Sequence, residues 1–145
     1  MLIAVDFDGT IVQEDYAFDD VTTPLTFIPG AKAGLIALKD AGHLLILWST
    51  RANLALRHNW KLNPMWRQGI LPLDEARWKR NQPLHEARYQ QMLEFIAKEL
   101  PRVFDAVDDG TQGKPTGVVV FLDDKAFGSP RRQDFDWSEV VRLLG

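Results

Sequence analysis

The sequence predicts an α/β protein built on an open, Rossmann-like parallel sheet flanked by helices. Short apolar runs alternate with segments of helical periodicity, in the order strand, helix, strand, helix, strand, strand, helix. This order is typical of an open parallel sheet. A length of 145 residues fits one domain with a single core. We therefore expect a single domain over residues 1–145.

The first part of the chain predicts a strand, a turn and a helix. The apolar run Leu2–Val5 stops at acidic residues, as a strand buried on both faces does. The polar stretch that contains Pro24 and Pro29 predicts a turn and a small hairpin. Apolar residues at helical spacing then predict a helix that opens at 29–30, and Gly42 is its stop signal.

The middle of the chain predicts one more buried strand and one long helix. Residues 43–48 are mostly apolar and end in Ser49, and helical signals resume at 52. Residues 84–100 have helical periodicity, and Pro101 ends that pattern. The stretch from 59 to 91 is rich in Trp, Arg and Pro, and we expect it to form a short helical insertion within the domain.

The last part of the chain predicts two strands and a helix. Residues 103–107, apolar except for Asp105, predict a short strand, and 118–122 form the strongest strand pattern in the chain. Asp136 and Glu139 have the spacing of a capping box, which predicts the start of the last helix.

Polar residues stand directly after three of the predicted strands. These residues are Asp6 and Asp8, Ser49 and Thr50, and Asp123 and Asp124. If the strands are neighbours, these groups converge on one edge of the sheet, where open α/β sheets bind ligands. Carboxylates gathered in this way repel one another unless a cation lies between them, and oxygen ligands suit Mg²⁺.

Composition excludes several other classes of protein. The chain has no cysteine, so disulfides, thiolate catalysis and cysteine metal sites are excluded. A net charge of -3 argues against general affinity for nucleic acids. The sequence has no apolar run long enough for a membrane helix and no basic stretch before its first apolar run, so we expect a cytoplasmic protein. Residues 51–91 hold eight Lys or Arg and three Asp or Glu, about +5, which leaves about -8 for the rest.

Four short motifs resemble those of the haloacid dehalogenase superfamily. Asp6-Phe7-Asp8-Gly9-Thr10 resembles its first motif, and a strand that ends in Ser49 resembles its second. Lys114, shortly before a strand, resembles the third, and residues 122–126 resemble the fourth. Residues 46–51 are most similar to small bacterial and phage members. The resemblance covers roughly 1–58 and 101–144.

The resemblance implies a magnesium-dependent phosphatase with defined roles for its residues. Asp6 would be the nucleophile, and Asp8 the general acid and base. Lys114 would neutralise both the nucleophile and the phosphate. The implied substrate-binding residues are Gly9, Ser49, Thr50, Arg51 and Lys114. The implied Mg²⁺ ligands are Asp6, the main-chain carbonyl of Asp8, Asp123 and Asp124.

The interval between the first two motifs is too short for a large cap domain, so we expect an open site. The expected substrate is a small phosphomonoester of the nucleotide or sugar phosphate class. Three alternatives remain: a phosphotransferase or mutase, a non-catalytic magnesium and phosphate binding module, and a phosphatase acting on nucleic-acid ends. Ser49 also fits a helix cap, and Lys114 also fits an ordinary surface lysine.

The tryptophans and cations of the insertion admit two interpretations. Trp60, Trp66 and Trp78 alternate with arginines and lysines, a pattern that can stack on bases and grip phosphates. More often such tryptophans pack a small subdomain, and we favour that interpretation.

Overall fold

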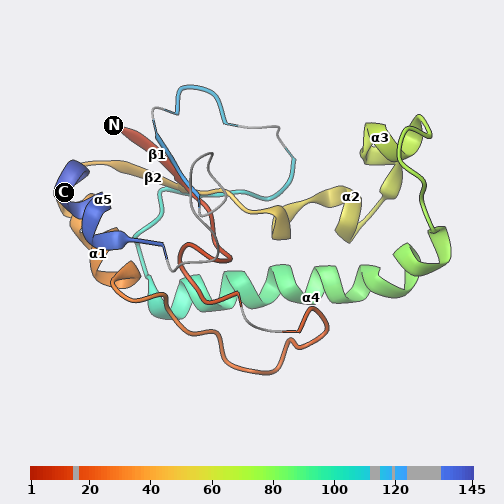
Figure 1. The fold of residues 1–145 in the computed structure, drawn as a ribbon, viewed down its shortest axis with the longest axis horizontal. Coiled ribbons are helices and arrows are strands. Elements are labelled where there is room, and N and C mark those ends of the chain that lie inside the picture. Colours follow the sequence, from red (N-terminus) through yellow and green to blue (C-terminus); the bar gives the residue numbers. More distant parts are fainter. Residues whose placement is uncertain (15–16, 112–114, 119, 124–134) are drawn as a thin grey trace.

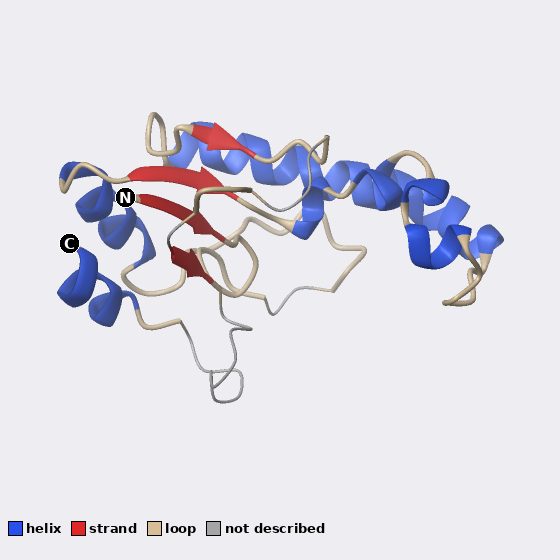
Figure 2. Cartoon of the chain, turned by 90° about the horizontal axis from the view of Figure 1, so that it is seen from above, coloured by secondary structure: helices blue, strands red, loops and turns tan. Residues whose placement is uncertain are grey.

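The computed structural model describes residues 1–14, 17–111, 115–118, 120–123 and 135–145 (Figure 1). Within these ranges the chain forms a four-stranded sheet in the order β3-β2-β1-β4, with every pair parallel. The strands are β1 (Leu2–Val5), β2 (Leu44–Leu47), β3 (Ala106–Val107) and β4 (Val120–Leu122). Figure 2 shows their arrows pointing the same way. The predicted α/β class with a parallel sheet is confirmed.

Three longer helices accompany the sheet. They are α1 (Ala31–Asp40), α4 (Glu75–Glu99) and α5 (Trp137–Leu144). α1 and α5 lie side by side, and α4 runs along the body and out beyond the sheet (Figure 1). Four single turns link β2 to α4: η1 (Thr50–Ala52), α2 (Leu54–Arg57), η2 (Trp60–Leu62) and α3 (Pro64–Arg67).

The helices cover one face of the sheet. The side chains of Ile3, Val5 and Leu45 are fully buried in one core that also holds Met92 of α4 and Trp137 of α5. The residues that alternate with these along each strand point to the other face of the sheet, because successive side chains of a strand lie on opposite faces. Ala4 is buried in the central strand, but Leu44 is 54% exposed and Phe121 is 37% exposed.

The prediction of a strand buried on both faces is therefore correct for β1, whereas β2, which was also predicted to be buried, and β4 each have an exposed residue on one face. The physical reason lies in the connection from β3 to β4. Its described residues, 108–111 and 115–118, form no helix that would cover the second face. We call the surface that carries Leu44, Ile46, Trp48 and Phe121 the open face.

The start of α4 differs from the prediction. The sequence predicted a helix from 84 to 100, but α4 begins at Glu75, where Asp74 accepts a hydrogen bond of 3.1 Å from the backbone N–H of Arg77. Pro83 lies inside the helix. Proline removes one helical hydrogen bond. Pro83 and Lys79, the residue four positions earlier, are both exposed, so water can bind the carbonyl group that loses its partner.

Figures 1 and 2 show that the helical turns after α2 and the first half of α4 form an arm that extends from the body. We define the arm as residues 58–88. In the part of the chain that the structure describes, no helix is both long enough and apolar enough to span a membrane.

Candidate active site at the carboxyl edge of the sheet

The strand order places Asp6 and Asp123 side by side. β2 and β3 extend the sheet on one side of β1, whereas β4 lies on the other side, so the order reverses at β1. Open α/β sheets bind ligands at such a reversal, beyond the carboxyl ends of the strands. The N–H of Asp6 donates to Leu122 O at 2.9 Å, which carries the β1–β4 pairing one residue further. This pairing brings Asp6 next to Asp123, at about the 5 Å spacing of neighbouring strands.

A tight turn follows Asp6 and positions Asp8. Phe7 is fully buried, and its carbonyl accepts hydrogen bonds from the N–H groups of Thr10, Ile11 and Val12 at 3.3, 2.9 and 3.2 Å. Gly9 has a φ of 78°, a conformation that favours glycine over other residues. Its N–H donates to Val12 O at 2.9 Å. The turn therefore holds the Asp-x-Asp pair of the first motif in a defined conformation.

Arg51 holds Asp8 in a bidentate ion pair. Its Nη2 donates to Asp8 Oδ1 at 2.7 Å, and its Nε donates to Oδ2 at 2.8 Å. Its Nη1 donates to Arg88 O at 2.9 Å and to Gln91 Oε1 at 3.0 Å, both on α4. The Arg51 side chain is 3% exposed, and its guanidinium lies 5.1 Å from the centre of the Phe7 ring. Arg51 was predicted to bind substrate, and here it orients Asp8.

Ser49 caps the short helix that follows β2. Its Oγ accepts a hydrogen bond of 3.1 Å from the N–H of Arg51, and the residue is 4% exposed. A serine hydroxyl that accepts one bond still has a proton to donate, so this cap leaves the predicted role of Ser49 open. Thr50 is exposed. Both residues line a hollow of about 240 Å³ at the carboxyl edge, together with Trp48, Asn53, Asp108 and Gly110.

Asp108, which follows β3 at the same edge, was not among the site residues predicted from the sequence. The N–H of Asp108 donates to Leu47 O at 2.8 Å, and its Oδ1 accepts from the N–H of Gly110 at 2.9 Å. Burial raises the pKa of the Asp108 carboxyl, although the N–H groups of Gly110 and Ser49 bind its charged form. Asp108 directly follows the predicted strand 103–107, and an acidic residue directly after a predicted strand is the same signal that identified Asp6 and Asp123.

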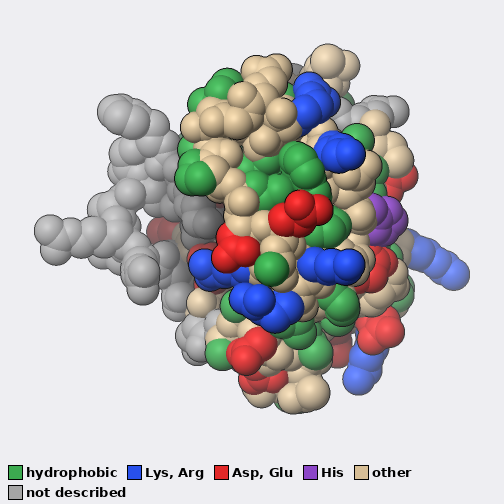
Figure 3. Space-filling view, turned by 90° about the vertical axis from the view of Figure 1, so that its right-hand side faces the viewer, with side chains coloured by type: hydrophobic (Ala, Val, Ile, Leu, Met, Phe, Trp, Pro, Cys, Tyr) green, Lys and Arg blue, Asp and Glu red, His purple; other side chains and the backbone are tan. Residues whose placement is uncertain are grey.

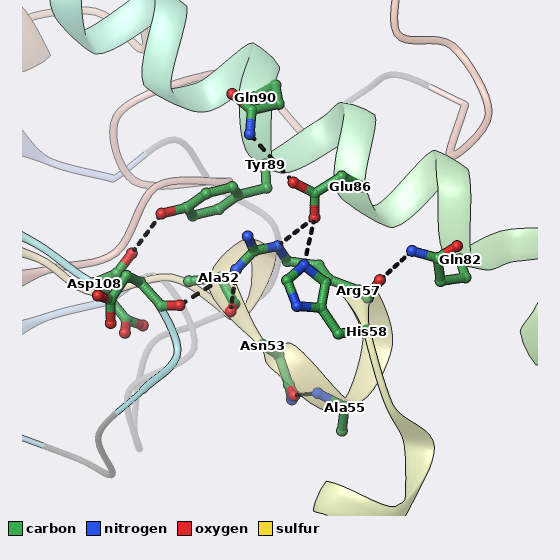
Figure 4. Close-up of polar contacts among 11 residues, drawn as sticks. Ala52, Asn53, Ala55, Arg57, His58, Gln82, Glu86, Tyr89, Gln90 and Asp108 are labelled. Carbon is green, nitrogen blue, oxygen red and sulfur yellow. Dashed lines mark hydrogen bonds and ion pairs between the residues drawn. The ribbon is translucent and has the colours of Figure 1, made fainter.

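A second buried arginine anchors this edge to α4 (Figure 4). Arg57 Nε donates to Glu86 Oε2 at 2.8 Å, and its guanidinium lies 3.6 Å from the centre of the Tyr89 ring. Its Nη1 donates to Ala52 O at 2.9 Å and to Asp109 O at 3.3 Å. The pKa of Glu86 is lowered, chiefly by the hydrogen bond from Arg57. This network fixes the chain segments that follow β2 and β3.

The described donors fit a magnesium ion but do not by themselves enclose one. Among the residues that the structure describes, no group of three or more acidic or histidine side chains is placed to hold a metal. Asp6 and Asp123 supply two carboxylates, and Mg²⁺ in enzymes is usually held by one or two carboxylates with waters and substrate phosphate. The predicted ligand Asp124 and the predicted catalytic Lys114 lie outside the described residues.

Comparisons with known proteins found no relative. No family model matches the chain, and neither a curated protein nor a solved structure matches it.

Proposed function

We propose that the protein is a magnesium-dependent phosphatase of the haloacid dehalogenase type, which hydrolyses small phosphomonoesters through an aspartyl-phosphate. The nucleotide and sugar phosphate classes are the proposed substrates. One observation carries the proposal: Asp6 and Asp123 end neighbouring parallel strands at the point where the strand order reverses. Asp8, two residues after Asp6, has its carboxylate fixed by Arg51.

In the first half-reaction a carboxylate oxygen of Asp6 attacks phosphorus. The new O–P bond forms as the bond between phosphorus and the leaving oxygen breaks, and Asp8 gives its proton to that oxygen. In the second half-reaction Asp8 accepts a proton from water as the water oxygen attacks phosphorus. The bond between Asp6 and phosphorus then breaks, which releases phosphate and restores both carboxyl groups.

The remaining residues hold charge and position the phosphate. Asp6 and Asp123, with the carbonyl group of Asp8, would bind Mg²⁺, which neutralises the charge between the phosphate and the nucleophile. The Ser49 hydroxyl would donate to a phosphoryl oxygen. The N–H of Gly9 already donates to Val12 O at 2.9 Å, so the predicted contact of Gly9 with phosphate would require that bond to break.

A second candidate is a non-catalytic module that binds magnesium and phosphate. It is favoured by the ion pair of Asp8, because both oxygens of the predicted acid and base already accept hydrogen bonds from Arg51. A carboxylate offers about four acceptor positions, and Arg51 uses two of them. The pair is therefore compatible with catalysis, and we place the enzyme first. A phosphotransferase or mutase would use the same residues and a different acceptor.

The test is phosphate release from a panel of nucleotides, sugar phosphates and an aryl phosphate, with and without Mg²⁺. We expect release that depends on Mg²⁺ and that is lost in Asp6→Asn. Asp40→Asn is the matched control, because Asp40 is exposed at the end of α1, at the opposite edge of the sheet. Full activity of Asp6→Asn would refute the assignment of Asp6 as the nucleophile. Binding of Mg²⁺ without release of phosphate from any compound would favour the binding module.

A further inference from the structure

The arm has no core of its own. No residue between His58 and Arg88 is buried, although this segment contains three tryptophans and several aliphatic residues. Trp60, Trp66 and Trp78, for which the sequence favoured packing in a small subdomain, are each only partly buried. A segment that buries so little apolar surface gains little stability from its own packing, so its apolar side chains are available to another surface.

Exposed aliphatic side chains cluster near the end of the arm. Leu62 is 53% exposed, Met65 41%, Ile70 58% and Leu71 47%. We call these four residues the arm tip. Figure 3 views this end of the molecule and shows hydrophobic side chains among those of Lys and Arg. Scattered exposed leucines are common on monomers, but a cluster rimmed by charge is typical of an interaction site.

The charges around the arm tip select the kind of partner. The arm itself, residues 58–88, holds six Lys or Arg and three Asp or Glu, about +3, and the chain as a whole carries -3, so the rest carries about -6. Exposed cations of the arm include Lys61, Arg67 and Arg77, and they outnumber its acidic residues. Two arm tips would repel each other, whereas an arm tip and an acidic body attract each other.

The open face supplies a complementary surface on the same chain. Leu44 is 54% exposed and Phe121 is 37% exposed. Beside them lies a hollow of about 260 Å³, whose lining includes Ile46, Trp48, Asp108 and Asp109. The open face is thus apolar with carboxylates at its rim, and the arm tip is apolar with cations at its rim.

We propose that the arm tip of one copy of this chain docks on the open face of a second copy, in a reciprocal dimer. A two-fold arrangement uses each arm and each open face once and leaves neither exposed. This inference does not rest on the proposed enzymatic function, although Trp48 and Asp108 line both this hollow and the one at the carboxyl edge. A nucleic acid fits the arm less well, because bases stack on aromatic rings and the exposed residues of the tip are aliphatic. Trp78 is itself held by the hydrogen bond of 2.8 Å from its Nε1 to Ala55 O.

The first test is sedimentation velocity of the full chain over a wide range of concentration and salt. We expect a species of twice the 16.5 kDa chain mass, which dissociates more readily at about 1 M salt because the Debye length falls to about 3 Å. Ile70→Glu and Leu44→Glu should each weaken dimerisation at least about tenfold. Leu143→Glu, at a residue that is 64% exposed on α5, is the control and should dimerise normally. Monomeric wild-type protein at every concentration would overturn the proposal.

A mixing experiment then identifies the surfaces. The Ile70→Glu chain keeps an intact open face, and the Leu44→Glu chain keeps an intact arm tip. Their equimolar mixture should regain one of the two contacts and form heterodimers, which labelled chains reveal by energy transfer. This recovery also shows that both variants are folded. No recovery, or a dimer unaffected by either substitution, would overturn the proposal, as would binding of a single-stranded oligonucleotide by a wild-type monomer.

Discussion

The carboxylate of Asp8 is clamped by the guanidinium of Arg51, with N–O distances of 2.7 and 2.8 Å. The pair joins the turn after β1 to the turn after β2, and the residue Arg51 is buried. A bidentate pair fixes direction as well as distance, since two parallel hydrogen bonds define the plane of the carboxylate. On the proposed function, Arg51 therefore positions Asp8 for proton transfer.

Arg51→Lys tests this positioning role. Lysine keeps the charge but cannot form the planar fork, so Asp8 loses its fixed orientation. We expect kcat to fall about 10- to 100-fold while KM changes by less than about threefold. Steady-state kinetics measure both constants, and Arg142→Lys, at an exposed arginine of α5, is the control. A rise in KM at constant kcat would instead support the original expectation that Arg51 binds the substrate.

Glu86→Gln should destabilise the fold by about 1–3 kcal/mol. The substitution removes the charge that faces Arg57, whose side chain is only 7% exposed. The pKa of Glu86 is lowered from its ordinary 4.5, so its contribution to stability is present above that value and is lost as the pH falls through the lower, folded-state pKa. Urea denaturation at pH 7 and at acidic pH measures both effects. Glu139→Gln, which breaks an exposed pair with Arg142, should have little effect on stability.

Gly34→Ala should lower stability, although alanine usually favours a helix over glycine by about 1 kcal/mol. A Cβ at this position would lie 2.6 Å from Cε3 of Trp137, which is 1% exposed and cannot turn aside. We expect a net loss of about 1–3 kcal/mol from overpacking, measured by chemical denaturation. Ile36→Ala, at a residue of the same helix that is 40% exposed, should have a small effect. A more stable Gly34→Ala protein would show that α1 and α5 separate easily.

Asp108→Asn should raise the thermal midpoint at pH 7. Burial raises the pKa of Asp108 above its ordinary 3.8, so the folded protein holds this proton more tightly than the unfolded chain does. Stability from this group is greatest at low pH and is lost as the pH rises through the raised pKa. The advantage of the variant should therefore shrink below about pH 4.

Asp109 provides the opposite case for comparison with Asp108. A hydrogen bond from the Thr111 side chain is the main cause that lowers the pKa of Asp109, so Asp109→Asn should not stabilise the protein. Thermal unfolding of both variants over a range of pH separates the two effects. If Asp108→Asn also lost phosphatase activity, Asp108 would be a group retained for function at a cost in stability.

The sequence patterns predicted the strands of the sheet and the start of the last helix. The apolar runs at 2–5 and 118–122 became β1 and β4, the latter described from Val120, and Asp136 caps α5 as expected. These elements depend on local signals, which a single sequence carries. The order of the strands, which brings Asp6 beside Asp123, depends on pairings between distant residues, so the sequence supported it only through the expected fold class.

The roles of the buried arginines were not predictable in this way. Arg51 and Arg57 look like ordinary charged residues in the sequence, because their partners Asp8 and Glu86 lie 43 and 29 positions away. The length of α4 was underestimated because a local signal was misleading, whereas the arginines gave no local signal at all. Pro83 is a strong local stop signal, and the exposed surface of the helix allowed the chain to continue through it. Lys114 and Asp124 stay predictions.

α4 also gives the arm a mechanical connection to the site. A helix of 25 residues is about 37 Å long, and its far half carries the tryptophan-rich turns while its near half buries Tyr89, Met92 and Ile96. Between the halves, the backbone of Arg88 and the side chain of Gln91 hold Arg51, and Arg51 holds Asp8. A displacement of the arm would therefore reach the carboxylate of Asp8 through α4, its two hydrogen bonds to Arg51 and the ion pair between Arg51 and Asp8. Pro83 lies on the arm side of these contacts and removes one helical hydrogen bond, so we expect α4 to bend most easily there.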